Sequence, residues 1–454
     1  MRRTACLSVA CVLLAGCAST GPVAPETAID APPAFATDLP PAGLDDNWWR
    51  GFRDSELAAL IERGLVVNLD ITAARDRLRA ADALLRAERS DFLPTIDGVG
   101  EAGVDVIGGN RVPGDSRVSA SAGLFGEFNP DLNGRLAAEV RAAAADYAEA
   151  DYLAADQRRL VAAAIASQYI EYRRTGAQLE LLADSTDLQE RTLRIVTLRF
   201  EAGLSANLDV RRAAADLAQT QARRGLIEIA RTNSANALAV LLGEPPGTFA
   251  PSLTREEVIV PRYKRGPEAG VPADLLRRRT DILASEARLA RAAADIGIAE
   301  ADLRPALVLP GSVGIGDGSL SGLFSDFFVS LGAALDLPLF DFGRRRAEVD
   351  AARAEAEARF SEYRMTFLEA LGEVENALVS IDAYRQRNAA LEEAIEQSEA
   401  ALGQSNALYR EGLTSLFDIL DAQRQLIASR QSLIDSEAAL ASSFVALHAS
   451  LGSP

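Results

Sequence analysis

Apolar residues recur with a helical period over most of the chain. Two segments, 133–202 and 342–411, keep this period for 70 residues each, and each would form a helix of about 105 Å at 1.5 Å per residue. The segments that follow them, 205–242 and 414–450, are shorter, at about 57 Å each. Two further segments supply the missing length, at about 40 and 35 Å: residues 66–92 and 281–303. The pattern therefore predicts an even cylinder of helices and not a compact bundle.

The segment 414–450 also carries a strict seven-residue repeat. One row of this repeat holds Ile419, Leu426, Leu433, Leu440 and Leu447, and a second row holds Leu420, Ile427, Ile434 and Ala441. A strict heptad predicts left-handed supercoiling against neighbouring helices. The core of an ordinary coiled coil would give the same pattern, so the repeat alone does not separate the two arrangements.

Between the helical segments the period changes to two, in residues 95–129 and 306–340. Each segment reads as a hairpin of two strands with apolar residues on one face. The other face carries five acidic residues: Asp97, Glu101, Asp105, Glu127 and Asp336. Strands of about ten residues with this alternation are typical of a membrane β-barrel, whose acidic lumen would prefer cations to anions. A soluble hairpin packed on a core fits the alternation equally well, and the lipidation signal described below favours the membrane.

The chain is a tandem duplication. The heptapeptide GRLAAEV at 134–140 returns as GRRRAEV at 343–349, which is 209 residues later. At the same offset, FEAGLSANLDV at 200–210 returns as YREGLTSLFDI at 409–419. Two matches at one offset are much less expected by chance than one, so each half of the chain should build the same unit.

The duplication sets the expected domain organisation. We expect a first repeat at 46–246, a proline-containing connector at 247–272 and a second repeat at 273–454. A length of 454 residues would ordinarily suggest about three globular domains. The repeats and their long helices argue instead for one elongated body.

Each long helical segment ends at a glycine, and these two places should be tight turns at the end farthest from the strands. The turns consist of Gly203, Leu204 and Ser205 in the first repeat and of Gly412, Leu413 and Thr414 in the second. Glycine readily takes the left-handed conformation that closes a helix. A serine or threonine at the last position can cap the next helix, so we expect Ser205 and Thr414 to be caps.

The first residues resemble a secretory signal. Two arginines precede the short apolar run 6–15, and Leu14-Ala15-Gly16-Cys17 follows it; the run is too short for a membrane span. This ending resembles a bacterial lipobox, which predicts a signal peptide at 1–16, acylation of Cys17 and an extended tether at 17–45. An ordinary signal peptide cleaved elsewhere is the alternative. Ala18 resembles the residue found in lipoproteins that continue to the outer membrane.

Composition excludes several function classes. Loss of the signal peptide with its two arginines would leave 45 basic against 65 acidic residues, a net charge of −20, which is unsuited to nucleic acid. His448 is the only histidine, and Cys17 would be the only remaining cysteine, so a His/Cys metal site is not expected. The GxGxxG pattern at 98–103 continues into a strand and does not open a helix, as a dinucleotide site requires. We expect no enzyme activity and no cofactor.

Five further motifs occur in a characteristic order along the chain: Trp48-Trp49, the run 241–247, the run 275–282, the run 340–344 and Asp421-Ala-Gln-Arg424. With the duplication and the strand–helix order, they resemble the outer-membrane efflux protein (TolC-like) family, in its lipoprotein branch. The resemblance covers essentially the whole chain after the signal peptide. One departure is Thr280, where the family usually has proline.

The resemblance implies a fold that is mostly α with a small β part. Tandem long-helix hairpins would form an α-barrel, and four strands per chain would contribute to a 12-stranded transmembrane β-barrel in a homotrimer. The protein would be the outer-membrane channel of a tripartite efflux system, lipid-anchored and extending into the periplasm. Its partners would be a periplasmic adaptor, a proton-driven inner-membrane transporter and outer-membrane lipid. A type I protein-secretion channel is the alternative within the same class.

The resemblance also implies roles for residues near the two turns. The turn residues would contact the adaptor. Phe417, Asp421 and Arg424, which share one helix face after the second turn, would form the gate. Ordinary pairing of Asp421 with Arg424 on the outer surface is the alternative reading of these charges.

Overall fold

The computed structural model describes residues 47–109, 112–249, 259–264, 278–315 and 327–452. The predicted signal peptide, Cys17 and the tether lie outside the described residues, as does most of the predicted connector. The chain divides into two compact units. The first holds Asp76–Tyr152 and Ala284–Met365, and the second holds the described residues up to Arg75 together with Leu153–Leu283 and Thr366–Pro454.

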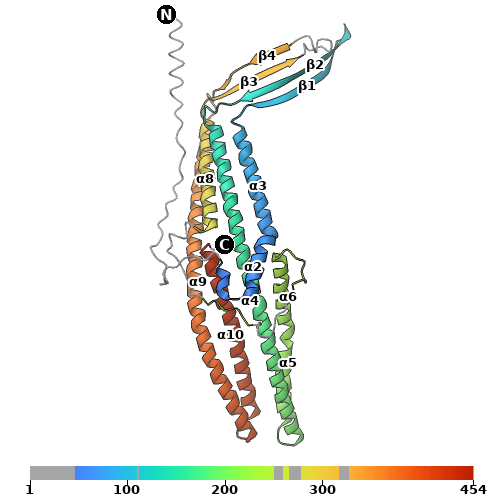
Figure 1. The fold of residues 1–454 in the computed structure, drawn as a ribbon, viewed down its shortest axis with the longest axis vertical. Helices are drawn as coiled ribbons and strands as arrows, with labels where there is room; N and C mark the ends of the chain where they lie inside the picture. Colours follow the sequence, from blue (N-terminus) through green and yellow to red (C-terminus); the bar gives the residue numbers. More distant parts are fainter. Residues whose placement is uncertain (1–46, 110–111, 250–258, 265–277, 316–326, 453–454) are drawn as a thin grey trace. The chain divides into compact units, whose positions relative to one another are not determined.

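Helices form most of the described chain (Figure 1). In chain order they are the 3-10 helix η1 (Trp48–Phe52), α2 (Ser55–Val67), α3 (Leu69–Ser90), α4 (Arg135–Glu201), α5 (Asn207–Ala222), α6 (Arg224–Leu241), α8 (Thr280–Ala301), α9 (Arg344–Arg410) and α10 (Leu416–Ser450). The two long helices agree with their predicted bounds to within about two residues. The first return segment differs from its prediction, because it is divided into α5 and α6 at Arg223.

The strands of both repeats join in one antiparallel sheet of the first unit. They are β1 (Thr95–Gly109), β2 (Val112–Phe128), β3 (Ala306–Ile315), β4 (Phe327–Leu331) and β5 (Ala334–Asp336). The order across the sheet is β1-β2-β3-β4, and β5 also pairs with β3. The pairing of β2 with β3 joins the two repeats, because Ala122–Phe128 lies against Leu309–Ile315.

The last strand is shorter than predicted. A single strand from 327 to beyond 336 was expected from the alternation, but β4 ends at Leu331 and β5 begins at Ala334. Both pair with the same side of β3, so they occupy one strand position. The interruption lies opposite Pro310, which has no N–H for a ladder, and whose carbonyl accepts a hydrogen bond from the amide of Gly332 at 2.9 Å.

The second unit begins at an aromatic cluster that ties η1 to the end of α10. Trp48 is 1% exposed and stacks on His448 at 5.4 Å between ring centroids. The His448 Nε2 atom lies 2.7 Å from the Tyr263 hydroxyl, and Tyr263 stacks on Phe444 at 4.5 Å. The only histidine is therefore a packed residue of a helix, as its apolar neighbours in the sequence predict.

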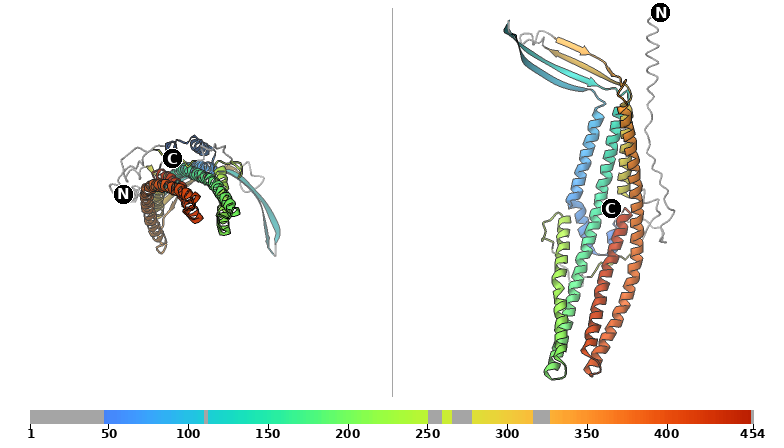
Figure 2. Two further views of the ribbon diagram at one scale, coloured as in Figure 1. Left: turned by 90° about the horizontal axis from the view of Figure 1, so that it is seen from below. Right: turned by 180° about the vertical axis from the view of Figure 1, so that it is seen from behind.

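The lower helices of the second unit stand side by side along a curve when seen along their axes (Figure 2, left). Side-chain bonds hold neighbours together. Arg430 of α10 pairs with Glu399 of α9 at 2.5 Å, and Gln423 of α10 donates to Thr192 of α4 at 2.8 Å. Thr280, at the start of α8, donates its hydroxyl to Asp156 at 2.9 Å, so this residue finds a partner where the family usually has proline.

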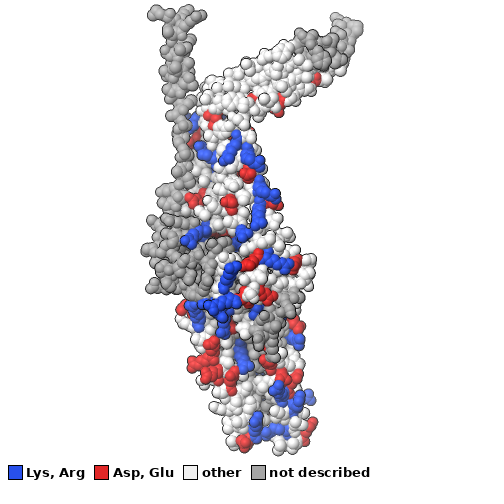
Figure 3. Space-filling view, in the orientation of Figure 1, with Lys and Arg blue, Asp and Glu red and all other residues white. Residues whose placement is uncertain are grey.

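Charged residues are distributed unevenly between the helices and the sheet. Lys, Arg, Asp and Glu are spread over the helical surface, whereas the described part of the sheet is largely uncharged on the face drawn in Figure 3. Among the described residues, no helix combines the length and the apolar character that crossing a membrane requires.

Candidate functional site

Both long helices of the second unit end in the same turn, and we call these two places the tip turns (203–205 and 412–414). Gly203 has φ +71° and Gly412 has φ +74°. The next amide in each turn bonds back to the helix, Leu204 to the Arg199 carbonyl at 2.7 Å and Leu413 to the Leu408 carbonyl at 2.9 Å. This is the Schellman arrangement, which satisfies the last carbonyls of a helix and needs a left-handed residue.

The helices after the tip turns begin differently from the prediction. Ser205 and Thr414 are not the caps. In the first repeat the residue before α5 is Ala206, which has no capping side chain. In the second, Ser415 and Asp418 form a capping box: the Asp418 carboxylate accepts from the Ser415 amide at 3.0 Å and from its hydroxyl at 2.7 Å. The Thr414 hydroxyl donates to the same carboxylate.

The hydrogen bonds at Asp418 fix its charge. They lower the pKa of Asp418 below its ordinary value, with the bond from the Thr414 hydroxyl as the largest cause. The carboxylate therefore stays ionised and favours the positive N-terminus of α10.

An arginine and a tyrosine tie the two tip turns together. Arg199, near the end of α4, donates to the Tyr409 carbonyl at 3.3 Å. Its guanidinium also lies 4.5 Å from the centre of the Tyr409 ring. Burial raises the pKa of Tyr409, and the neighbouring Arg199 opposes that shift. A cation over an aromatic face is attractive, so this contact holds the ends of the two long helices beside each other.

A small apolar core lies under the second tip turn. It is formed by buried residues of α4, α9 and α10: Val196, Leu402, Leu416, Ile419, Leu420 and Leu426. Gln423 lies beside this core with 2% of its surface exposed. Its amide donates to Thr192, but its Oε1 has no hydrogen-bond partner among the described residues. A buried acceptor without a partner is costly, so this packing is not at its most stable.

The structure places the three predicted gate residues on the exposed side of α10. Phe417 is 53% exposed, and Asp421 and Arg424 are also exposed. The alternative reading, a pairing of Asp421 with Arg424, is not found among the described residues. Arg424 instead makes a two-pronged ion pair with Asp216 of α5, at 2.6 and 3.1 Å. The Asp216 bond is the main cause that raises the pKa of Arg424, and Asp421 adds a smaller attraction.

Asp216 is the partner that the sequence did not indicate. Its side chain is 8% exposed, whereas that of Arg424 is 53% exposed. Nothing local marks the pair, because the two residues are 208 positions apart. A buried polar or charged group is costly without a partner, so the loss of Arg424 should disturb Asp216 more than the loss of Asp216 disturbs Arg424.

Apolar side chains are exposed around both tip turns. Leu204 is 68% exposed in the first turn and Leu413 is 74% exposed in the second. Phe200 and Leu208, on either side of the first turn, are 42% and 56% exposed. Together they offer apolar surface at the place where the resemblance puts the adaptor.

The backbone register gathers the predicted lumen residues on one face of the sheet. Glu101 pairs with Ser121, and Thr95 pairs with Glu127, so the odd positions of β1 and β2 share a face. Through β3 the same face reaches Asp336, which pairs with Ala306. Asp97, Glu101, Glu127 and Asp336 therefore lie on one face, and the backbone register puts the position of Asp105 in the same row.

On the described part of the sheet, the opposite face is apolar and its side chains are exposed. Its residues include Ile96, Leu124, Val329 and Leu331, which are 71%, 51%, 59% and 88% exposed. Apolar side chains at this exposure are usually covered by a partner or a membrane.

The GxGxxG pattern at 98–103 lies inside β1, so it opens no helix. The described residues contain no cluster that could hold a metal ion.

Comparison with known proteins gives one family. The model of the family described as outer membrane efflux protein matches residues 60–244 and 271–453. The chain is 30% identical to the pyoverdine export outer membrane protein OpmQ of Pseudomonas aeruginosa over 98% of this chain and 95% of the relative. It is also 30% identical to the solvent efflux pump outer membrane protein SrpC of Pseudomonas putida, over 88% and 86%.

A solved structure agrees with these sequence relatives. The outer-membrane channel OprN superposes with a TM-score of 0.87 at 29% identity, covering 95% of this chain and 99% of the other.

Proposed function

The chain belongs to the outer membrane efflux protein family, and we propose that it is the passive exit duct for small toxic compounds or drugs. Its relatives are outer-membrane channels of efflux pumps, and this protein is an outer-membrane efflux channel of the same kind. An inner-membrane transporter, proton-driven in our proposal, would export the compounds through a periplasmic adaptor. The relatives do not favour the alternative of a type I protein-secretion channel.

The division of the sheet into two faces is the observation that carries the proposal. The carboxylates of Asp97, Glu101, Glu127 and Asp336 share one face, and the other face carries exposed apolar side chains. Placed in a membrane barrel, the apolar face would meet lipid and the acidic face would line a water-filled lumen that prefers cations. Acylation of Cys17 would add a lipid anchor to the outer membrane.

Closure of the barrel requires more than one chain. The sheet has four strand positions, and β1 and β4 are its edges. In lipid an open edge leaves backbone groups unpaired at several kcal/mol each, and a closed barrel needs about eight strands at least. Two chains would give an interior filled by side chains, whereas three would give twelve strands and room for solutes. The proposed assembly is therefore a homotrimer.

The tip turns are the proposed contact with the adaptor. The turns 203–205 and 412–414 each hold one exposed leucine, Leu204 and Leu413, on a hydrogen-bonded Schellman turn. Apolar residues held on a fixed backbone lose little entropy when they bind a partner.

The proposed gate consists of Phe417, Asp421 and Arg424, with Asp216 added by the structure. The pair of Arg424 with Asp216 connects α10 to α5. A largely exposed ion pair is worth about 0.2–1 kcal/mol, and Asp216 is more buried than that case assumes. Three such pairs in a trimer would form a latch that holds α10 at rest and that docking of the adaptor can release.

The assembly is tested by the native mass of the protein in mild detergent. The proposal predicts three chains, each carrying the acyl groups on Cys17, and it predicts that Cys17→Ala removes the acyl mass. A stable monomer or dimer of the folded protein would contradict the closed barrel.

A further inference from the structure

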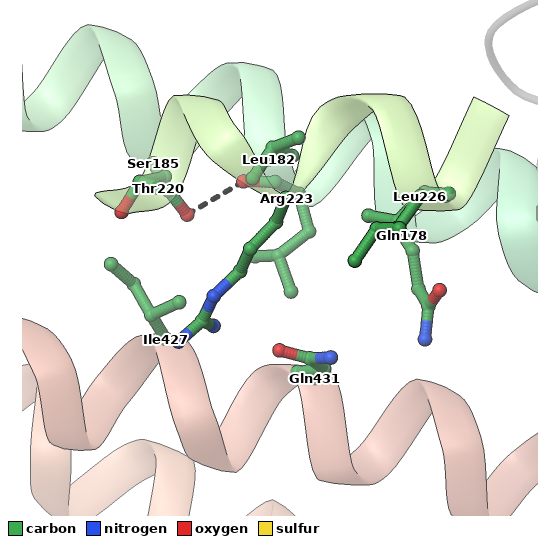
Figure 4. A pocket seen from close by; sticks show the side chains of 10 residues that line it. Gln178, Leu182, Ser185, Thr220, Arg223, Leu226, Ile427 and Gln431 are labelled. Atoms are coloured by element: carbon green, nitrogen blue, oxygen red, sulfur yellow. Dashed lines mark hydrogen bonds between the residues drawn. The ribbon is translucent and has the colours of Figure 1, made fainter. Parts of the chain in front are cut away.

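Four helices of the second unit, α4, α5, α6 and α10, surround a pocket of about 200 Å³ (Figure 4). It lies where the first return segment is interrupted between α5 and α6. Its apolar wall includes Leu182 of α4, Leu226 of α6 and Ile427 of α10. Gln178, Gln431 and Arg223 add polar groups to the lining.

The interruption brings an arginine into this pocket. Arg223 lies between α5 and α6, and its side chain extends across the opening towards Ile427 and Gln431 of α10 (Figure 4). Within the described parts of the chain, its guanidinium has no recorded ion pair or hydrogen bond. The next residue, Arg224, donates to Glu228 at 2.7 Å. Both arginines are exposed, but Arg224 already has an acidic partner, whereas Arg223 is available to a ligand in the pocket.

Size and chemistry define the class of ligand. An apolar cavity of about 150 Å³ holds one benzene ring, so a pocket of about 200 Å³ has room for one ring with a small substituent. A guanidinium recognises a carboxylate through two parallel hydrogen bonds. We propose that this pocket binds a monocyclic aromatic carboxylate, with its ring against Leu182, Leu226 and Ile427 and its carboxylate on Arg223.

Occupancy of the pocket should affect the movement of α10. The ligand would touch α4, α6 and α10 together, and Arg424 of α10 already pairs with Asp216 of α5 one to two turns closer to the tip. A ligand that fits this arrangement shifts the population towards it. This consequence rests on the proposed function, because it assumes that α10 must move when the channel opens.

Binding is tested by calorimetry on the purified full-length protein in detergent, with benzoate as the probe and benzyl alcohol as its neutral counterpart. We expect benzoate to bind, and Arg223→Gln to weaken it at least tenfold while benzyl alcohol binding is unchanged. Arg224→Gln is the matched control and should leave both unchanged. A benzoate affinity that is the same in wild type and Arg223→Gln, or no benzoate binding at all, would overturn the site.

A second variant tests the location without changing charge. Leu226→Trp should fill the pocket and abolish binding of both probes, and circular dichroism should show the wild-type helix content. Unchanged benzoate binding in this folded variant would place the ligand elsewhere and overturn the proposal.

The effect on the channel is measured separately, as ion current across a lipid bilayer. Benzoate should reduce current through the wild-type protein and have no effect on Arg223→Gln. If benzoate binds through Arg223 but leaves the current unchanged, the site stands and its control of α10 is refuted. If neither the wild type nor Arg223→Gln passes current, the proposed channel function is contradicted, and the binding result is unaffected.

Discussion

At matching positions of the two repeats, α5 and α10 start from the same turn with different side chains. Leu416 and Leu420 of α10 are 2% and 3% exposed and belong to the core under the tip. The positions 209 residues earlier hold Asn207 and Arg211, which are exposed. The turn is the same in both repeats, but only the second return helix contributes buried residues to the core under the tip.

The second return helix is also better capped and more continuous than the first. The capping box of Ser415 and Asp418 has no equivalent at Ala206. The first return segment is interrupted at Arg223, whereas α10 runs unbroken from Leu416 to Ser450. The second return helix therefore has a capped start and contributes buried residues to the core under the tip. The first depends on its neighbours, and its interruption opens a pocket.

The largest effect of this difference is expected from a pair of alanine substitutions at matching positions. Leu420→Ala should lower the free energy of unfolding of the tip by about 2–5 kcal/mol, because it leaves a cavity in the core. Arg211→Ala, at the corresponding position of α5, should change it by less than about 0.5 kcal/mol. Hydrogen exchange of the tip amides measures both. Equal losses would mean that the two helix starts are supported alike.

Substitution of the glycine should destabilise the two tip turns equally, in contrast to the two helix starts. An added Cβ at Gly203 or Gly412 meets no atom within 4 Å, so substitution costs only the left-handed backbone. Valine should cost about 1–2 kcal/mol at either turn, and asparagine should cost less because it visits this region more easily.

If the tips bind the adaptor, Gly412→Val should also reduce efflux in cells while the protein still assembles in the membrane, and Gly412→Asn is its matched control. Wild-type efflux with Gly412→Val would argue against docking at this turn.

A smaller effect is expected from pH at the start of α10. The pKa of Asp418 lies below its ordinary value in the folded protein, chiefly because the Thr414 hydroxyl donates to its carboxylate. Its contribution is therefore present above about pH 4 and is lost as the pH falls through the lowered pKa. The protection factor of the amides in the first turn of α10 against hydrogen exchange should fall on acidification, and Asp418→Asn should remove this dependence. Asp209, the corresponding residue of α5, is the control, and a similar effect of Asp209→Asn would contradict the special role of the capping box.

The sequence predicted the features that depend on neighbouring residues. The long helices, both glycine turns and the acidic strand face follow from period and turn chemistry, and all appear in the structure. The prediction misplaced each cap by one residue: the N-caps are Ala206 and Ser415, and not Ser205 and Thr414.

Features that depend on distant residues could not be predicted. The pairing of Arg424 with Asp216 joins positions 208 apart, and only the packed helices bring them together. No proline lies near Arg223 in the sequence, so no local signal marks the division between α5 and α6. The gap between β4 and β5 arises opposite Pro310 of a different strand.

The most direct test of the account is the ion current of the purified protein in a planar lipid bilayer, compared with Asp216→Ala and with the charge swap Asp216→Arg with Arg424→Asp. We predict a small, cation-selective resting current for the wild type. The current should be several times larger for Asp216→Ala, and the swap should return it towards the wild-type value. A folded, membrane-inserted protein that passes no current in any of the three forms would contradict the channel, and an unchanged current in Asp216→Ala would contradict the latch.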